Sequence, residues 1–212
     1  VLEAMWTRFL PHLDVVTRLV ADGALGIVHT VLADHGQLLT AQAAPRLHRA
    51  DLGGGALLDL GIYPVSFAAA VLGRPGEIAA TGSWAPSGVD EQVGAVLRTG
   101  SAYAVVSTTL AARTPTTASV SGTRGRLELG GPFYTPVPLR WVAADGSVAI
   151  REVDPIRGHE GLCFQAAHLA QLVADGRTDS PVLPIAQTVS IMETMDELRR
   201  RLGPPPAETK EH

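Results

Sequence analysis

The chain has 212 residues, of which 46% are hydrophobic and 18% charged, a globular composition with room for one large domain or two small ones. A net charge of −4, with no basic run longer than Arg199–Arg201, argues against nucleic acid as a partner and favours small-molecule ligands. The single cysteine, Cys163, excludes an intrachain disulfide and favours a reducing, cytoplasmic location. No apolar run approaches the roughly 18 residues that span a bilayer, and no secretory leader is visible, so no membrane association is expected.

The first part of the chain predicts a helix, a strand and a long polar loop. Pro11 suits the first turn of a helix, which an apolar stripe extends to about Asp22. Residues 27–35 are rich in β-branched side chains and predict a strand. Residues 37–51 form a loop of about 15 residues, a length that is often functional. Arg46 and His48 in this loop are therefore candidate substrate contacts.

Three glycines, residues 53–55, precede the segment on which the functional interpretation depends. Asp59 and Tyr63 follow four residues apart, and positions i and i+4 share one face of a helix. They are candidates for an acid–base pair at a helix start, where glycines let another molecule approach the backbone. Pro64 predicts a kink or a break in this helix. The alternative is a glycine-rich turn before a core helix, with Tyr63 an ordinary half-buried aromatic residue.

The pattern changes to short strands between residues 77 and 153. The predicted strands are 77–84, 92–98, 102–110, 116–121, 125–129, 139–142 and 148–153. Turn dipeptides between them, such as Asp145-Gly146, imply mostly antiparallel pairing. A helix over 161–175 and another over about 185–202 follow. In the last helix, four apolar residues are expected to face inward: Val189, Met192, Met195 and Leu198.

This order of elements predicts an α+β fold, an open and mostly antiparallel sheet with helices packed on one face. The other sheet face also carries apolar residues, such as Val105, so we expect a homodimer or higher homo-oligomer to cover it. The predicted domain spans residues 1–203, with residues 1–23 as its leading helix segment. Residues 204–212 are rich in proline and polar residues and are expected to be a disordered tail.

Several chemistries lack their sequence signatures. There is no phosphate loop and no Gly-x-Gly-x-x-Gly after a strand, so no nucleotide-binding signature is present. The histidine spacing and the lack of a cysteine pair predict no metal site. Cys163 and His168 project differently on a helix, so Cys163 is expected to be a small buried residue rather than a nucleophile. The one lysine, Lys210, lies in the tail, which excludes a catalytic lysine in the body of the chain.

Several stretches together resemble the C-terminal domain of the glucose–fructose oxidoreductase, inositol dehydrogenase and rhizopine-catabolism (Gfo/Idh/MocA) oxidoreductases. In chain order they are Glu3-Ala4-Met5-Trp6-Thr7-Arg8-Phe9, Gly53-Gly54-Gly55-Ala56-Leu57-Leu58-Asp59-Leu60-Gly61-Ile62-Tyr63, Ser180-Pro181-Val182-Leu183-Pro184 and residues 192–200. The first motif and the tyrosine four residues after Asp59 resemble most the glucose–fructose oxidoreductase and dihydrodiol dehydrogenase branch. Other branches carry histidine in place of Tyr63.

The resemblance implies a glyceraldehyde-3-phosphate dehydrogenase-like C-terminal domain. It also implies hydride transfer between NAD or NADP and a sugar, a polyol or a dihydrodiol. In the family an N-terminal Rossmann domain, absent here, binds the nucleotide and supplies a lysine that assists proton transfer. By the same resemblance Tyr63 exchanges the proton, Asp59 orients the substrate, and Trp6 and Arg8 line the pocket near the nicotinamide.

A phenol with a pKa near ~10 needs a nearby cation to act as a base at neutral pH, and the lysine of the Rossmann domain could supply it. The chain alone is therefore expected to be inactive. Two other interpretations stay open: a non-catalytic sugar-binding regulator of the same fold, and a bare oligomerisation module. The intact pair of Asp59 and Tyr63 argues against the regulator.

Overall fold

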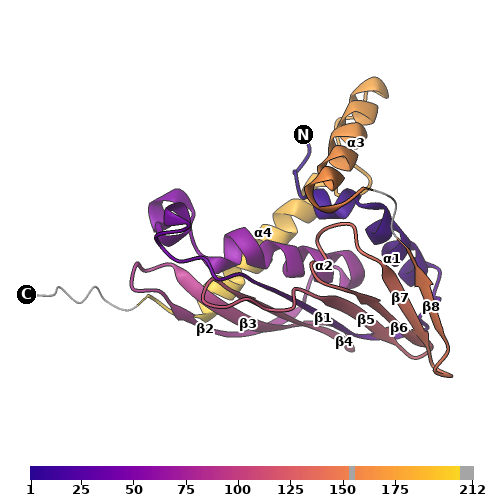
Figure 1. The fold of residues 1–212 in the computed structure, drawn as a ribbon, viewed down its shortest axis with the longest axis horizontal. Helices are drawn as coiled ribbons and strands as arrows, with labels where there is room; N and C mark the ends of the chain where they lie inside the picture. Colours follow the sequence, from indigo (N-terminus) through magenta and orange to yellow (C-terminus); the bar gives the residue numbers. More distant parts are fainter. Residues whose placement is uncertain (153–155, 206–212) are drawn as a thin grey trace, which may run out of the picture.

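A computed structural model describes residues 1–152 and 156–205. Its centre is one sheet of eight strands in the order β2-β3-β4-β1-β5-β6-β7-β8, with helices on one face (Figure 1). The strands are β1 (Val28–Gly36), β2 (Glu77–Trp84), β3 (Asp90–Thr99), β4 (Ala102–Thr109), β5 (Ala118–Gly122), β6 (Gly125–Leu129), β7 (Leu139–Ala143) and β8 (Val148–Arg151). The predicted α+β class is confirmed.

The first strand is inserted into the middle of the sheet. β1 runs parallel to β4 and antiparallel to β5, whereas the other pairings among the described strands are antiparallel. A parallel neighbour requires a long crossover, and here the chain between β1 and β4 supplies it. The segment directly after β1 therefore lies over the end of the sheet where β1 and β4 finish, with His35 paired to Thr108.

The predicted strands after residue 77 are confirmed with small differences at their ends. Strand β5 begins at Ala118 rather than Thr116, because Thr116 has a positive φ of 56° and its N–H donates to the Asp34 carboxylate at 2.7 Å. The predicted end of the last strand at residue 153, and most of the predicted tail, lie outside the described residues.

The helical elements are η1 (Trp6–Phe9), α1 (Pro11–Ala21), η2 (Pro45–His48), η3 (Ala50–Leu52), η4 (Leu57–Gly61), α2 (Ile62–Leu72), η5 (Gly158–Gly161), α3 (Leu162–Ala174) and α4 (Ile185–Arg201). α2 lies across β1 and β4 and buries Val65 and Phe67 there. Pro64 does not break the helix, because η4, a π-helix, runs directly into α2. The predicted kink is therefore a local change of helix type.

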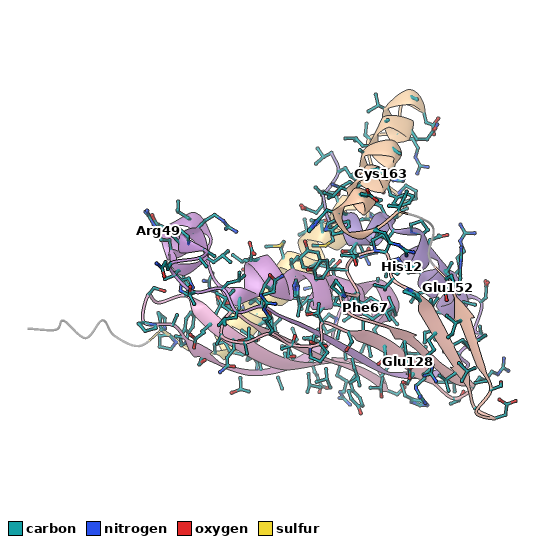
Figure 2. All side chains as sticks on the ribbon, in the orientation of Figure 1. His12, Arg49, Phe67, Glu128, Glu152 and Cys163 are labelled. Carbon is teal, nitrogen blue, oxygen red and sulfur yellow. The ribbon has the colours of Figure 1, made fainter. Side chains whose placement is uncertain are left out.

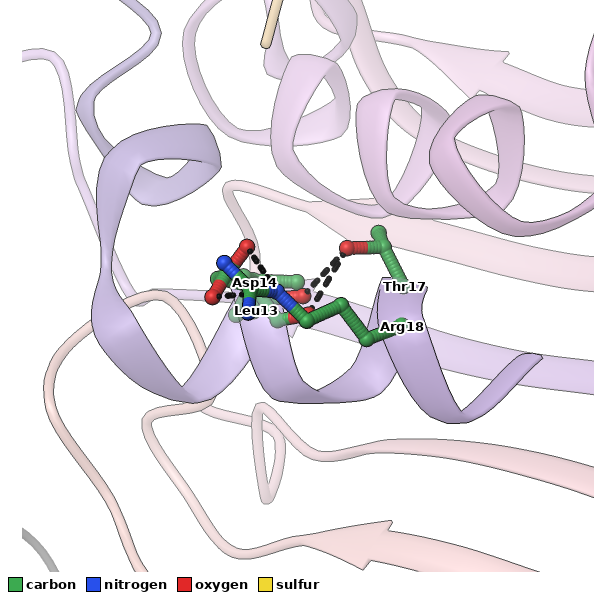
Figure 3. A network of polar contacts seen from close by, with 4 residues as sticks. All are labelled: Leu13, Asp14, Thr17 and Arg18. Carbon is green, nitrogen blue, oxygen red and sulfur yellow. Dashed lines mark hydrogen bonds and ion pairs between the residues drawn. The ribbon is translucent and has the colours of Figure 1, made fainter. Parts of the chain in front are cut away.

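The outer face of α1 carries a polar network that is local to the helix (Figure 3). Arg18 Nε donates to Asp14 Oδ1 at 3.0 Å, and Thr17 Oγ1 donates to the carbonyl oxygens of Leu13 and Asp14 at 3.1 and 3.0 Å. On the inner face Leu13 and Val16 are buried. An exposed i, i+4 ion pair of this kind supports the helix by a few tenths of a kcal/mol at most, so this network is structural.

Helix α3 rises away from the sheet (Figures 1 and 2), and this corrects the prediction for Cys163, which is exposed. Leu162, Leu169 and Val173 are also exposed, Val173 at 71%. In α4, Met195 and Leu198 are buried as predicted, but Val189 and Met192 are not. Helical spacing identifies an apolar stripe; it does not say whether the chain itself covers that stripe.

The stretch Ala50–Leu72 corrects the expectation about membrane spans. It is long and apolar enough to cross a bilayer, with a mean hydropathy of 1.7 over 18 of its residues, and 56% of that window is buried inside the fold. A core helix passes the same test of length and composition, and α2 is such a core helix.

Among residues 1–152 and 156–205, the sheet face opposite the helices carries exposed side chains. In β4, Ala104 and Val106 point to the helices and are buried, whereas Tyr103 and Val105 alternate with them and are exposed. Val105 lies in register with Val96 on β3 and Leu32 on β1, which are exposed too. The middle of the open face is thus an apolar row that crosses three strands.

Candidate active site

Tyr63 lies in a cluster of aromatic rings contributed by four separate segments. Tyr63 comes from α2, Trp6 from η1, His35 from the end of β1 and Tyr134 from the connection between β6 and β7. Ring centroids lie 5.2 Å apart for His35 and Tyr63, 4.6 Å for His35 and Tyr134, and 4.9 Å for Tyr63 and Tyr134. Trp6 meets Tyr134 edge-on at 6.2 Å. Such packing fixes ring orientation beyond what apolar burial does alone.

The Tyr63 hydroxyl has a defined partner. Trp6 Nε1 lies 3.2 Å from the Tyr63 oxygen. An indole N–H can only donate, so the phenol oxygen accepts this hydrogen bond and its own proton is free for another acceptor. Tyr63 is half-buried rather than enclosed. The group can therefore give a proton to a bound molecule, and the indole N–H would stabilise the phenolate that remains.

Sequence reasoning missed His35 and Tyr134. His35 is 1% exposed, with Nδ1 3.2 Å from the Leu60 carbonyl oxygen and Nε2 2.9 Å from Gln37 Nε2. Burial lowers the pKa of the His35 imidazole, and burial, followed by the nearby Tyr63, raises the pKa of the Tyr134 phenol. The only signal in the sequence was the position of His35 on the inward side of a predicted strand, directly before the long loop.

Asp59 lies inside the π-helix, which spans Leu57–Gly61. π-bulges within α-helices are frequent at functional sites. The wider turn alters the i, i+4 relation from which a shared face was predicted, and no hydrogen bond joins Asp59 and Tyr63 in the described part of the chain. The Tyr63 ring packs on His35, and the Asp59 charge is close enough to oppose slightly the lowering of the His35 pKa that burial causes.

The predicted loop residues lie near Asp59 to different degrees. The Arg46 guanidinium, from η2, pairs with the Asp59 carboxylate, and the two side chains are 54% and 32% exposed. His48 Nε2 lies 2.8 Å from the Leu39 carbonyl oxygen and so secures its own loop. Arg46 thus belongs to the Asp59 side of the site. A substrate contact for either residue stays a prediction.

Arg8 points away from the aromatic cluster. Its NH2 group donates to the Val182 carbonyl oxygen at 3.2 Å and to Gln187 Oε1 at 2.9 Å. The side chain is buried, and burial lowers the pKa of its guanidinium to about 10, so it is still charged at neutral pH. Trp6 therefore reaches Tyr63, whereas Arg8 ties η1 to the start of α4. Its predicted place near a nicotinamide stays a prediction.

The glycines before η4 are required by the chain itself. A Cβ on Gly54 would collide with backbone carbonyl oxygens in 46–49, and one on Gly55 would collide with the Asp90 carboxylate. Asp90 is fully buried, and its Oδ2 accepts the Leu57 N–H at 2.6 Å. Asp90 thus anchors the start of the π-helix. The close approach expected of another molecule at these glycines is made here by β3 and by the loop.

No cluster of three or more potential metal ligands occurs within 1–152 and 156–205. Trp6 is 5% exposed and stacks on His159 with ring centroids 5.8 Å apart, so the half-buried Tyr63 phenol, rather than the indole, is the group that the reacting end of a nicotinamide cofactor could meet. The chain shows no glycine-rich phosphate loop for the rest of a dinucleotide.

Comparison with known proteins gives a consistent result. Residues 14–128 match the GFO/IDH/MocA C-terminal domain. The chain is 32% identical over 215 residues to trans-1,2-dihydrobenzene-1,2-diol dehydrogenase of Bos taurus, and 30% identical over 208 residues to that of Homo sapiens. Each match covers 95% of this chain and 62% of the relative. The chain thus spans less than two thirds of the length of these curated relatives.

Solved structures share the fold. The aldose-aldose oxidoreductase of Caulobacter crescentus, complexed with glycerol, aligns with a TM-score of 0.77 at 28% identity, over 92% of this chain and 59% of that one. KijD10, a 3-ketoreductase of Actinomadura kijaniata in complex with NADP and TDP-benzene, aligns with a TM-score of 0.79 at 21% identity, over 93% and 61%. With the family match over residues 14–128, the chain belongs to the GFO/IDH/MocA C-terminal domain family.

Proposed function

We propose that this chain is the substrate-binding and oligomerisation part of an NAD(P)-dependent oxidoreductase that acts on a sugar, a polyol or a dihydrodiol. The observation that carries the proposal is the Tyr63 hydroxyl, which accepts the Trp6 N–H at 3.2 Å and keeps its own proton for a ligand. The names of the relatives support the class, because they include a dihydrodiol dehydrogenase, an aldose-aldose oxidoreductase and a 3-ketoreductase.

In this proposal the proton moves at the Tyr63 oxygen. In the oxidative direction the Tyr63 phenolate takes the proton of a substrate hydroxyl as the carbon that carries this hydroxyl loses a hydride, leaving a carbonyl. In the reductive direction the phenol gives that proton to the new alkoxide. The Trp6 N–H stabilises the phenolate in both directions. The nicotinamide, bound as NAD or NADP, supplies or accepts the hydride.

Asp59 has the complementary task of orientation. Its carboxylate is partly exposed beside Arg46, so it can accept hydrogen bonds from substrate hydroxyls without a large desolvation cost. Asp59 pairs with Arg46 and Tyr63 with Trp6, so the two groups can act separately: Tyr63 exchanges the proton and Asp59 binds the polyol. Sugars, polyols and dihydrodiols all carry the second hydroxyl that this arrangement needs.

Nucleotide binding belongs, in this proposal, to a further domain of the same polypeptide. Solved neighbours are described with NADP or with NAD+, and the choice between them is open here. The apolar stripe of α3, exposed at Leu162, Leu169 and Val173, is a surface against which such a domain can pack. The chain alone is expected to show neither turnover nor measurable affinity for NAD(P). Cytoplasmic location is proposed with the same function.

The test uses the polypeptide with its nucleotide-binding domain and follows NAD(P)H absorbance against a panel of aldoses, polyols and dihydrodiols. Replacing Tyr63 with Phe is expected to lower turnover by roughly 10²–10⁴-fold, the usual share of a positioned acid–base group. Tyr103→Phe is the matched control, because Tyr103 lies on the sheet face opposite the helices and phenylalanine keeps the ring that this face would present to a second copy. Turnover that survives Tyr63→Phe contradicts the assignment. Saturable sugar binding without any hydride transfer would favour the non-catalytic regulator instead.

We also propose that two copies pair through the open sheet face, whose apolar row is Leu32, Val96 and Val105. Val105→Asp is expected to convert the oligomer to a monomer in light scattering, since it would place an uncompensated charge in the interface. Leu52→Asp, an exposed site in η3, is the control and leaves the mass unchanged. A wild-type chain that is monomeric at tens of micromolar overturns this pairing.

A further inference from the structure

His35 lies directly behind Tyr63 and both of its ring nitrogens are engaged. The Leu60 carbonyl oxygen can only accept, so Nδ1, at 3.2 Å, carries the imidazole proton. Nε2 then has a lone pair and accepts from the Gln37 amide, 2.9 Å away. The neutral form satisfies both contacts, and burial lowers the pKa of the ring in the same sense. His35 therefore has no free position from which to pass a proton on.

The carbonyl that His35 binds is in an unusual position. In an α-helix the Leu60 oxygen would accept the N–H of residue 64, but that residue is Pro64, which has no N–H. A backbone N–H at the Ile62 cap reaches the same oxygen, and Nδ1 of His35 supplies a second donor from outside the helix. The contact lies where η4 gives way to α2, one turn from Tyr63.

The ring of His35 also bounds the ring of Tyr63. The two planes meet at 72° with centroids 5.2 Å apart, and Tyr134 closes the triangle at 4.6 Å from His35 and 4.9 Å from Tyr63. The Tyr63 ring thus has three neighbours with fixed positions: His35, Tyr134 and, at its hydroxyl, Trp6. A shift of the backbone at Leu60 would move Tyr63 relative to Trp6.

We propose that His35 is a positioning residue: through the hydrogen bond from Nδ1 to the Leu60 carbonyl, at the turn where Pro64 removes the helical donor, it holds the Tyr63 phenol in place for proton exchange. This rests on the proposed function of Tyr63. It assigns His35 no proton of the reaction, and it explains why a buried histidine stands where an apolar ring of similar size would pack as well.

The experiment compares four forms of the polypeptide with its nucleotide-binding domain: wild type, His35→Phe, Pro64→Ala and the double variant. Phe keeps the ring and removes the donor, so kcat is expected to fall by roughly tenfold to a hundredfold, as for a misplaced catalytic group, with KM changed less than about threefold. The Pro64→Ala substitution restores a backbone N–H that can donate to the Leu60 oxygen. The double variant is therefore expected to recover most of the lost kcat, and Pro64→Ala alone to stay near wild type.

Each other result decides against the proposal. An unchanged kcat in His35→Phe, a fall confined to KM, or a double variant no faster than the single one all contradict it. Where His35→Phe fails to fold, an active, folded double variant supports the donor role and an inactive or unfolded one contradicts it.

A readout without turnover separates this proposal from the proposed function. This chain has three tyrosines and so contributes three sets of NMR signals from ring-labelled tyrosine. His35→Phe is expected to shift or broaden the Tyr63 and Tyr134 signals, Pro64→Ala to restore them, and exposed Tyr103 to serve as the internal reference. If the wild type transfers no hydride but these signals change as expected, the proposed function fails while His35 still positions Tyr63. If the wild type is active and the signals do not change, the positioning role of His35 is contradicted and the proposed function is not.

Discussion

The two ends of the segment 53–64 are built in opposite ways. At the Tyr63 end, rings from three other elements surround the side chain, and a buried histidine ties down the helix beneath it. At the Asp59 end, one carboxylate meets one arginine from a short loop helix, and both are substantially exposed. The fold therefore fixes the phenol that we propose to exchange the proton, whereas the ion pair at Asp59 is open to solvent and to a ligand.

The energies differ as much as the surroundings. Buried aromatic pairs and satisfied buried hydrogen bonds each contribute about 0.5–1.5 kcal/mol, and they are cooperative where they share partners. An exposed ion pair contributes about 0–1 kcal/mol. Changes at the Tyr63 end should therefore alter stability and activity together, and changes at the Asp59 end should alter substrate binding with little effect on stability.

The largest stability effect is expected at Asp90, which anchors the start of the π-helix at Leu57, two residues before Asp59. Asp90→Ala leaves the buried Leu57 N–H without its acceptor, at a cost of about 3 kcal/mol. Asp90→Asn keeps an acceptor oxygen and should cost clearly less. Urea denaturation of the three proteins gives the comparison. Equal losses for Ala and Asn would show that the carboxylate acts through its charge near Arg199, 3.4 Å away, rather than through the Leu57 N–H.

The second-largest stability effect is expected from acid, which should lower the free energy of unfolding through buried histidines near the Tyr63 end. Burial lowers the pKa of His12 from its ordinary 6.5 to about 4, and its Nε2 lies 3.3 Å from the Phe133 carbonyl oxygen beside Tyr134. Because the folded pKa is depressed, the stabilising contribution is complete above the unfolded pKa of ~6.5 and is lost as the pH falls toward about 4. Burial also lowers the pKa of His35, so protonation of His35 is expected to add to the loss of stability in acid.

For His12 alone the loss between pH 7 and pH 5 is expected to be about 2 kcal/mol. Urea midpoints measured at both values give the slope. His12→Gln should flatten it by most of that amount, because glutamine can keep a hydrogen bond to the carbonyl without titrating. An unaltered slope in that variant would place the acid sensitivity in other groups.

The difference between the two ends also explains what the sequence could predict. Strand alternation, turn dipeptides and the glycines predicted the α+β class and the position of the segment 53–64, because those signals are local. The inserted position of β1 depends on long-range pairing that no local pattern carries. His35 and Tyr134 could not be predicted for this cluster, because a histidine on a strand and a tyrosine beside Phe133 have the pattern of core residues. The inserted position of β1 brings them together.

The errors have a physical reason too. A helical stripe of apolar residues identifies α3, but only the fold shows that α3 stands clear of the sheet with Cys163 exposed. The prediction that Asp59 and Tyr63 share a face assumed an α-helix, and it did not allow for the π-helix that contains Asp59. Arg46 was proposed as a substrate contact because it lies in a long loop; the structure pairs it with Asp59, and the substrate contact stays a prediction.

The smallest stability effect, and the sharpest contrast, is expected at Arg46. Arg46→Met should change the free energy of unfolding by less than about 0.5 kcal/mol, because the pair is exposed. It should raise KM for a polyhydroxy substrate several-fold and leave kcat within about threefold, the pattern of lost substrate binding. Arg49→Met is the matched control, since Arg49 is similarly exposed and pairs with Asp51 in the same loop. A loss of more than about 1 kcal/mol in Arg46→Met, absent from Arg49→Met, would show that the ion pair with Asp59 helps to hold the loop in place. The Asp59 end would then contribute to stability as the Tyr63 end does, and the two ends would not differ in this respect.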